Sequence, residues 1–417
     1  MKSSLIPMKA LGFRLLPELL IIVSILTFYR CADQLTGPEM EVTEQQSGLL
    51  KPDLPDVLIR VPDDWNGELV VFAHGYVSPN APLEAWRSQL IIDGETGETL
   101  DDLVVNQGYA FAGTSFERNG LIIPEAVANL IELVGLFENQ HGEPDVVYIA
   151  GASEGGLITA LAVEQHPEVF DGGLATCGPI GNFRKQLHYF GDFNVVFNYY
   201  FPYVLVPFGG PPKPDGVNDT LIAAWEADDL GSPVGPKDAV VGALIANPGK
   251  TQKLLSVTRA PVGTGDQETV AETILGILFY NIVGTNNAID VLGGKPFDNT
   301  RRWYSGTGSF WEDLRLNRGV ERYAADAIAL TEIEDNYQTA GALKVPLVTM
   351  HTTDDPIVPY WHEPMYTLKT FATRSALFHR NIPVYRYGHC NFTQEEILHA
   401  FEVLVRRVKI QRALASL

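Results

Sequence analysis

Basic residues are few in this sequence relative to acidic ones. The 417 residues include 30 Lys and Arg against 51 Asp and Glu, so the formal net charge is −21 at pH 7. A surface of this sign repels phosphate backbones and acidic membrane surfaces alike. We therefore exclude nucleic acid as a partner, and we expect any membrane attachment to involve the N-terminus alone.

Motifs for metal and nucleotide chemistry are missing as well. The sequence has no H-E-x-x-H, no cysteine cluster with zinc-ligand spacing and no G-x-x-x-x-G-K-[ST] phosphate loop. No repeat period or long low-complexity stretch is present either. The sequence thus gives no reason to expect a metal ion or a cofactor, and it predicts a globular protein with a small-molecule partner.

The N-terminal residues have the layout of an export signal. Three basic residues precede the apolar run "LLIIVSILTFY" at 19–29, which is too short to span a bilayer comfortably. We predict a signal over residues 1–30, with an anchor helix over 15–29 as the alternative. Cys31 resembles the lipid-attachment cysteine of bacterial lipoproteins, and the polar segment 31–54 is typical of a tether. The expected location is periplasmic, outer-membrane-anchored or extracellular.

Short apolar runs rich in Val, Ile and aromatic residues recur along the chain and predict buried strands. They lie at 56–61, 68–75, 108–116, 146–151, 345–351 and 382–387. Helical patterns separate them, including an apolar stripe from Val127 to Val134 and a final helix through about Val408 with a capping box at Thr393 and Glu396. This alternation predicts an α/β fold with a mostly parallel central sheet flanked by helices.

The alternation of strands and helices is interrupted once. Residues 55–180 and 342–417 carry the strand series, whereas 181–341 is rich in aromatic residues and turns and lacks it. We predict that 181–341 is a mainly helical or irregular lid insertion over one face of the sheet. Most of its aromatic residues are expected to pack a core of its own, and 188–208 is expected to contribute to an apolar acyl or aryl pocket.

One serine lies at a sharp bend between a predicted strand and a predicted helix, in "VVYIAGASEGGLITALAVEQHP" at 146–167. Such a bend crowds the flanking backbone, and Gly151, Gly155 and Gly156 carry no Cβ that could clash. The bend lifts the Ser153 hydroxyl off the carboxyl end of the strand, and backbone N–H groups at the helix start can face an oxyanion. The pattern predicts a nucleophile together with donors for the charge that its attack creates.

The bend and three further motifs resemble the α/β-hydrolase superfamily over roughly residues 55–410 apart from the insertion. The three motifs are "FAHGY" at 72–76, "MHTTDDPIVP" at 350–359 and "RYGHCNFT" at 386–393. The resemblance implies an oxyanion hole formed by the backbone N–H groups of Tyr76 and Glu154. It also implies that the second motif supplies a catalytic acid and the third a catalytic base, in the chain order Ser, Asp, His.

The acid and the base each have competitors in the sequence. The superfamily alignment selects Asp355 as the acid, with the adjacent Asp354 as the alternative. Four histidines follow Asp355, and only His389 lies just beyond the carboxyl end of a predicted strand, where open α/β sheets build their sites. The others are expected to be structural: His379 precedes its strand, and His362 and His399 fall in helical stretches.

These residues predict a serine hydrolase that cleaves carboxylic esters through an acyl-enzyme intermediate. A serine exopeptidase of the aminopeptidase kind is the alternative, with Glu226, Asp228 and Asp229 as carboxylates that could hold a substrate amino terminus. A non-catalytic binding protein that kept the fold is less favoured, because all three triad residue types are present. The triplet Gly-His-Cys at 388–390 is similar to that of the tannase and feruloyl-esterase group, although that group has a cysteine where Ala152 stands here.

The chain has only three cysteines. If Cys31 is lipidated or removed, two remain in an oxidising compartment. Cys177 is expected at the carboxyl end of the strand after the nucleophile helix, and Cys390 adjoins His389, so both should reach the same edge of the sheet. We predict a disulfide between Cys177 and Cys390, with two free cysteines as the alternative.

Overall fold

The computed structural model describes residues 54–92, 97–228, 230 and 235–415, all within the second of two compact units, Thr43–Leu417. The predicted signal over 1–30, Cys31 and all but the last residue of the predicted tether lie outside the described residues. The expectations for export and lipid attachment therefore stay predictions.

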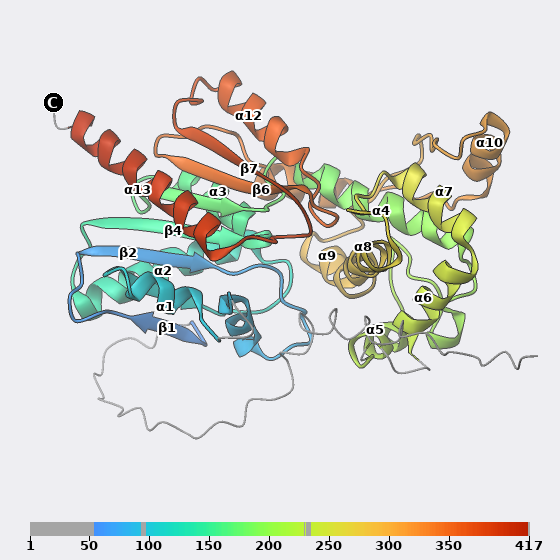
Figure 1. Cartoon of the computed structure of the whole chain (residues 1–417), viewed down its shortest axis with the longest axis horizontal. Helices are drawn as coiled ribbons and strands as arrows, with labels where there is room; N and C mark the ends of the chain where they lie inside the picture. Colours follow the sequence, from blue (N-terminus) through green and yellow to red (C-terminus); the bar gives the residue numbers. More distant parts are fainter. Residues whose placement is uncertain (1–53, 93–96, 229, 231–234, 416–417) are drawn as a thin grey trace, which may run out of the picture. The chain divides into compact units, whose positions relative to one another are not determined.

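A seven-stranded sheet forms the centre of the described part (Figure 1). Its spatial order is β1-β3-β2-β4-β5-β6-β7, with β1 antiparallel to β3 and every other pair parallel. The strands are β1 (Val57–Arg60), β2 (Glu68–Ala73), β3 (Ala110–Thr114), β4 (Val146–Ala152), β5 (Gly172–Thr176), β6 (Leu347–Asp354) and β7 (His379–Tyr387). The predicted mostly parallel sheet is confirmed, and its arrangement is that of the α/β-hydrolase fold.

Helices cover both faces of the sheet because the strands alternate between two apolar faces. Along β2, Leu69 and Val71 belong to one buried cluster, and Val70 and Phe72 belong to another. The first cluster is covered by α2 (Ile123–His141), α3 (Glu154–Gln165) and α12 (His362–Ala372). The second is covered by η4 (Leu83–Leu90), α1 (Leu100–Val105) and α13 (Gln394–Ala415).

The final helix is longer than the sequence pattern suggested. The capping box is present, because Thr393 N–H donates to the Glu396 carboxylate at 2.8 Å and Glu396 N–H donates to Thr393 Oγ1 at 3.3 Å. The predicted end near Val408 is wrong, since α13 continues to Ala415. No glycine or proline follows Val408 in the sequence, so nothing stops the helix there.

The segment between β5 and β6 is helical and packs a core of its own. It contains α4 (Phe183–Tyr200), η5 (Val206–Phe208), α5 (Asp219–Glu226), α6 (Pro236–Ala246), α7 (Pro248–Thr258), α8 (Gln267–Phe279), η6 (Tyr280–Gly284), α9 (Thr285–Val291), α10 (Phe310–Gly319), α11 (Ala327–Glu332) and η7 (Ile333–Tyr337). We call 181–341 the insertion. Its core includes Phe193, Phe197 and Trp225. The run Gln267–Val291 is long and apolar enough to cross a membrane, and several of its residues, including Ile274, Ile277 and Leu278, pack into this core.

The bend between β4 and α3 brings the backbone into close contact with two neighbouring strands. Ser153 has a φ of 58°, in the left-handed region that non-glycine residues rarely adopt. A Cβ on Gly155 would overlap the carbonyl oxygen of Ala73 at the end of β2, and one on Gly156 would lie 2.7 Å from the Thr176 oxygen at the end of β5. Both glycines are required because the first turn of α3 rests directly on the strand ends.

We expect Gly155→Ala to destabilise the protein by more than about 3 kcal/mol or to prevent folding, because the added methyl group meets rigid backbone. The matched control is Gly135→Ala in α2, where an added Cβ meets nothing within 4 Å. That variant should gain about 0.5–1 kcal/mol from better helix propensity. Urea-unfolding midpoints of both variants check the pair, and a Gly155→Ala protein as stable as wild type would contradict the close contact.

Candidate active site

Three side chains from three different strand ends meet in one hydrogen-bonded chain. Ser153 follows β4, Asp355 follows β6 and His389 follows β7. His389 Nε2 lies 2.8 Å from Ser153 Oγ, and His389 Nδ1 lies 2.8 Å from Asp355 Oδ2. The three meet because carboxyl ends of parallel strands share one edge of a sheet. With Nδ1–H donating to the carboxylate, Nε2 is the acceptor for the serine proton.

The structure brings Asp355, rather than Asp354, to the histidine. Asp354 is the last residue of β6, whereas Asp355 begins the following loop and is fully buried. The second oxygen of Asp355, Oδ1, accepts the N–H groups of Ile357 at 2.8 Å and Val358 at 2.9 Å. These bonds fix the carboxylate so that its other oxygen faces His389.

The remaining histidines after Asp355 lie elsewhere. His362 begins α12, and its Nδ1 accepts the Gly181 N–H at 2.9 Å. His379 begins β7, at the opposite end of that strand from His389, and His399 lies within α13. Each has the structural placement that the sequence pattern indicated.

A second histidine, the buried His351, also contacts Asp355, and this contact was not predicted from the sequence. His351 Nε2 lies 2.7 Å from the Val358 carbonyl oxygen and 3.4 Å from Asp355 Oδ2, while its Nδ1 lies 3.3 Å from Glu363 Oε1. Both ring nitrogens therefore face acceptors only, which favours the doubly protonated imidazolium. Burial lowers the pKa of His351, but the contacts with Asp355 and Glu363 outweigh it and raise that pKa to about 10.

The charge of His351 acts on the acid of the chain. Burial raises the pKa of Asp355, and the neighbouring His389 and His351 more than offset this effect, so the pKa of Asp355 lies below its usual value. Glu363 is fixed in turn, because it accepts from Thr349 Oγ1 at 2.6 Å. The hydrogen-bonded chain thus extends from Ser153 through Asp355 to a buried glutamate on α12. The only sequence signal was the position of His351 within the acid motif, since nothing in the pattern paired it with Glu363.

The two backbone N–H groups that the sequence predicts for an oxyanion hole come from separate segments of the core. They belong to Tyr76, in the loop after β2, and to Glu154, the first residue of α3. Neither donates to any group within the part of the chain that the structure describes. The loop is held by Gln89, whose Oε1 accepts the Gly75 N–H at 2.6 Å and whose Nε2 lies 3.3 Å from the carbonyl oxygen of Tyr76. Gln89 could not be predicted from the sequence motifs, because η4 lies outside all of them.

A disulfide joins Cys177 and Cys390, with their Cα atoms 5.4 Å apart. Cys177 follows β5, and its N–H donates to the Met350 carbonyl oxygen at 2.8 Å. The predicted pairing is confirmed. Among the described residues, only one group of side chains brings potential metal ligands together: Cys177, His389 and Cys390. Two of its three potential ligand atoms are the sulfur atoms of this disulfide. The grouping is therefore unsuited to holding a metal ion.

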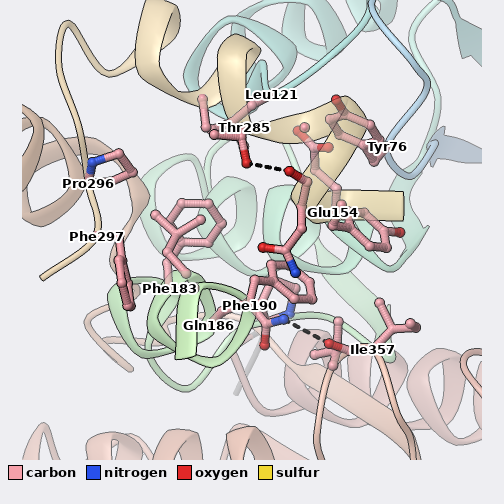
Figure 2. A pocket seen from close by; sticks show the side chains of 18 of the residues that line it. Tyr76, Leu121, Glu154, Phe183, Gln186, Phe190, Thr285, Pro296, Phe297 and Ile357 are labelled. Atoms are coloured by element: carbon pink, nitrogen blue, oxygen red, sulfur yellow. Dashed lines mark hydrogen bonds between the residues drawn. The ribbon is translucent and has the colours of Figure 1, made fainter. Parts of the chain in front are cut away.

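A cavity with mainly apolar walls opens beside Ser153 (Figure 2). Its walls come from the core and from the insertion, and they include Leu121, Phe183, Phe190, Tyr280, Phe297 and Ile357. From the predicted pocket segment 188–208, Phe190 and Gly191 line the cavity, whereas most other aromatic residues of that segment pack in the insertion's own core. Ser153 is among the residues that line the cavity, and His389 is not.

The carboxyl group of Glu154 also lines the cavity. Its Oε1 accepts the Ile122 N–H at 3.1 Å, and the residue is almost completely buried. Burial raises the pKa of Glu154 to about 8. This side chain is therefore mostly protonated at neutral pH and can donate a hydrogen bond.

Two of the three carboxylates considered for an aminopeptidase, Glu226 and Asp228, are hydrogen-bonded to other parts of the chain. Glu226 accepts from Ser78 Oγ at 2.5 Å and from Asn80 Nδ2 at 3.1 Å, which ties the insertion to the loop after β2. Asp228 accepts the Lys237 N–H at 2.7 Å. Neither is among the residues that line the cavity, and Asp229 lies outside the described residues.

Comparisons with known proteins give distant similarities. No protein-family model matches the chain. It is 23% identical to an o-phthalyl amidase of Xanthobacter agilis over 415 aligned residues, covering 85% of this chain and 86% of the amidase. Feruloyl esterase B from Aspergillus oryzae superposes with a TM-score of 0.44 at 15% identity, over 81% of this chain and 71% of the esterase. An acylaminoacyl peptidase superposes with a TM-score of 0.35 at 13% identity over 80% of this chain, which spans only 35% of the peptidase.

We expect Glu154→Gln to gain stability relative to wild type as pH rises. The folded state holds the pKa of Glu154 at about 8 against an ordinary 4.5, so wild type loses folding free energy as pH rises through this window, and the amide does not. Between pH 5 and pH 8.5 the relative gain should be at most about 4 kcal/mol. Urea unfolding at the two pH values measures it. The exposed control Glu138→Gln should differ from wild type equally at both.

We expect His351→Gln to move the acid limb of the pH profile, in which the labelling rate of Ser153 is plotted against pH, to higher pH. Without the imidazolium of His351, the pKa of the buried Asp355 rises, so the carboxylate that orients His389 is protonated, and labelling is lost, at a higher pH than in wild type. The measurement is the rate of Ser153 labelling by a fluorophosphonate between pH 5 and pH 9. The control His362→Gln removes another buried histidine that does not contact Asp355. Equal slowing at every pH in both variants would show that His351 only supports the fold.

Proposed function

We propose that this protein is an exported serine hydrolase that cleaves carboxylic esters through an acyl-enzyme intermediate. The observation that carries the proposal is the hydrogen-bonded chain Ser153–His389–Asp355 at the carboxyl edge of the sheet, with two backbone N–H groups beside the serine. Such a chain activates a hydroxyl group that is otherwise a weak nucleophile. It requires no metal or cofactor.

The proposed reaction has two halves. Ser153 Oγ attacks the ester carbonyl carbon while His389 Nε2 takes its proton, and the N–H groups of Tyr76 and Glu154 stabilise the oxyanion. His389 then gives the proton to the departing alcohol, and the acyl group stays on Ser153. In the second half, His389 takes a proton from water, the resulting hydroxide attacks the acyl-enzyme, and the acid leaves as Ser153 regains its proton. Asp355 orients the imidazole and stabilises its charged form throughout.

The cavity is assigned to the acyl part of the substrate. His389 must face the leaving group in order to protonate it, and His389 is not among the residues that line the cavity, whereas Ser153 is. The group attached to the other side of the carbonyl carbon therefore enters the cavity. Because aromatic side chains such as Phe190 and Phe297 form its walls, an aryl or other apolar acyl group is the proposed occupant.

Amide hydrolysis is the second candidate activity. The similarity to an o-phthalyl amidase covers most of both chains, and the same triad can protonate an amine leaving group. An aminopeptidase is less favoured, because Glu226 and Asp228 hold loop contacts instead of lining the cavity. Export is supported by the disulfide between Cys177 and Cys390, since such bonds persist in oxidising compartments.

We expect Ser153→Ala to lower turnover by on the order of a millionfold while the protein stays folded. Hydrolysis of p-nitrophenyl esters and aminoacyl or aroyl p-nitroanilides, assayed side by side, measures the loss and ranks esters against amides. A fluorophosphonate probe should label wild type and the exposed-site control Ser88→Ala, but not Ser153→Ala. Equal labelling of the Ser153→Ala protein would show that the nucleophile is another residue.

A further inference from the structure

Tyr76 contributes a polar group to the cavity that the proposed reaction does not use. Its side chain lines the cavity, with the ring 5.7 Å from the ring of Tyr280. Its hydroxyl oxygen is buried and has no hydrogen-bond partner among the described residues. A buried hydroxyl without a partner costs on the order of 1–3 kcal/mol. This arrangement is typical of a group that meets its partner when a ligand binds.

Glu154 contributes a second polar group to the same region of the cavity. Figure 2 shows the Glu154 side chain and the Tyr76 ring on the same side of the cavity. One Glu154 oxygen accepts the Ile122 N–H. Burial raises the pKa of this carboxyl to about 8, so at neutral pH it carries a proton that it can donate. The cavity therefore presents two donors, a phenol and a carboxylic acid.

Three other polar side chains of the cavity are already bonded to the protein. Gln186 Nε2 donates to the Ile357 carbonyl oxygen at 2.8 Å, Asn281 Nδ2 to the Ile277 carbonyl oxygen at 3.1 Å, and Thr285 Oγ1 to the Asn281 carbonyl oxygen at 2.9 Å. No lysine, arginine or histidine is found among the described residues that line it. A ligand group that meets Tyr76 and Glu154 therefore finds donors without a fixed positive charge.

We propose that Tyr76 and Glu154 form a specificity subsite that selects aryl acyl groups bearing an oxygen substituent that accepts a hydrogen bond. The assignment rests on the proposed function, and it adds a substrate class to it. Aromatic walls hold the ring, and the two donors hold the substituent. The backbone N–H groups of the same two residues face the oxyanion, so a substituent bound at their side chains also positions the carbonyl carbon over Ser153. Binding energy at the substituent then contributes to the reacting geometry.

The accepting oxygen has two chemical sources. A neutral hydroxyl, methoxy or carbonyl oxygen can accept from both donors at once. A carboxylate can do the same by sharing the proton of Glu154, as paired carboxyl groups do. Both sources place an oxygen acceptor on the ring of the acyl group. Matched substrates distinguish a neutral oxygen from a carboxylate.

The experiment compares matched substrates on the full chain. Methyl and hydroxyl substituents are similar in size, so the kcat/KM ratio of hydroxybenzoyl over methylbenzoyl p-nitrophenyl esters reports contact with the oxygen. Ortho, meta and para isomers sample its position, and methoxy esters test an acceptor that cannot donate. The carboxylate arm uses p-nitroanilides of the three benzenedicarboxylic acids against the methylbenzoyl anilides. We expect a ratio of at least about tenfold at one ring position in one arm.

Variants test whether the side chains of Tyr76 and Glu154 cause this kcat/KM ratio. Tyr76→Phe should bring it close to one, and Glu154→Gln, which keeps an N–H donor, should lower it less. Thr285→Val removes a cavity hydroxyl that is already bonded to the Asn281 carbonyl oxygen, so it should keep the wild-type ratio.

Each result decides the assignment. A wild-type ratio near one at every position, or equal proportional losses on both substituents in Tyr76→Phe, overturns the subsite while Ser153-dependent hydrolysis upholds the proposed function. Hydrolysis that survives in Ser153→Ala, or no hydrolysis of any substrate, overturns both. A preference confined to the carboxylate arm identifies a carboxylate as the acceptor, and a preference in the ester arm identifies a neutral oxygen.

Discussion

The contact between the first turn of α3 and the ends of β2 and β5 determines the geometry of the whole site. Gly155 lies against the Ala73 carbonyl oxygen, and Gly156 lies against the oxygen of Thr176. This contact forces Ser153 into the left-handed region and lifts its hydroxyl above the sheet edge. It also places the Glu154 N–H beside the loop that carries Tyr76. The Ser153 hydroxyl and the Glu154 N–H are therefore positioned by one backbone packing arrangement.

Beneath the site, the buried imidazolium of His351 lies between two carboxylates. The Asp355 carboxylate lies between His389 and His351, and Glu363 lies on the far side of His351. A lone buried carboxylate would be costly, and the imidazolium of His351 offsets that cost without needing solvent. The arrangement lets Asp355 remain ionised while fully shielded from water.

Much of this organisation could be predicted from the sequence, because it depends on short-range patterns. Apolar runs marked the strands, glycines marked the bend at Ser153, and motif resemblance singled out Asp355 and His389. The contacts that escaped prediction join residues distant along the chain. Glu363 reaches His351 from α12, Gln89 reaches the Tyr76 loop from η4, and the cavity walls come from separate elements of the core and the insertion. No local periodicity encodes such contacts, and the end of α13 was missed because no breaker residue marks it.

The disulfide has a consequence for how the chain could be divided. Cys177 precedes the insertion and Cys390 follows it, so the bond closes a loop that contains all of 181–341. A peptide bond cut anywhere in the insertion would leave two fragments, one bearing Ser153 and the other bearing Asp355 and His389, still held together covalently. Both ends of the insertion are thus attached to the core. Within the core, the disulfide joins the residue after β5 to the loop that carries His389, independently of the insertion. Changes of sequence or length in the insertion could then reshape the cavity beside Ser153 without separating Ser153 from Asp355 and His389.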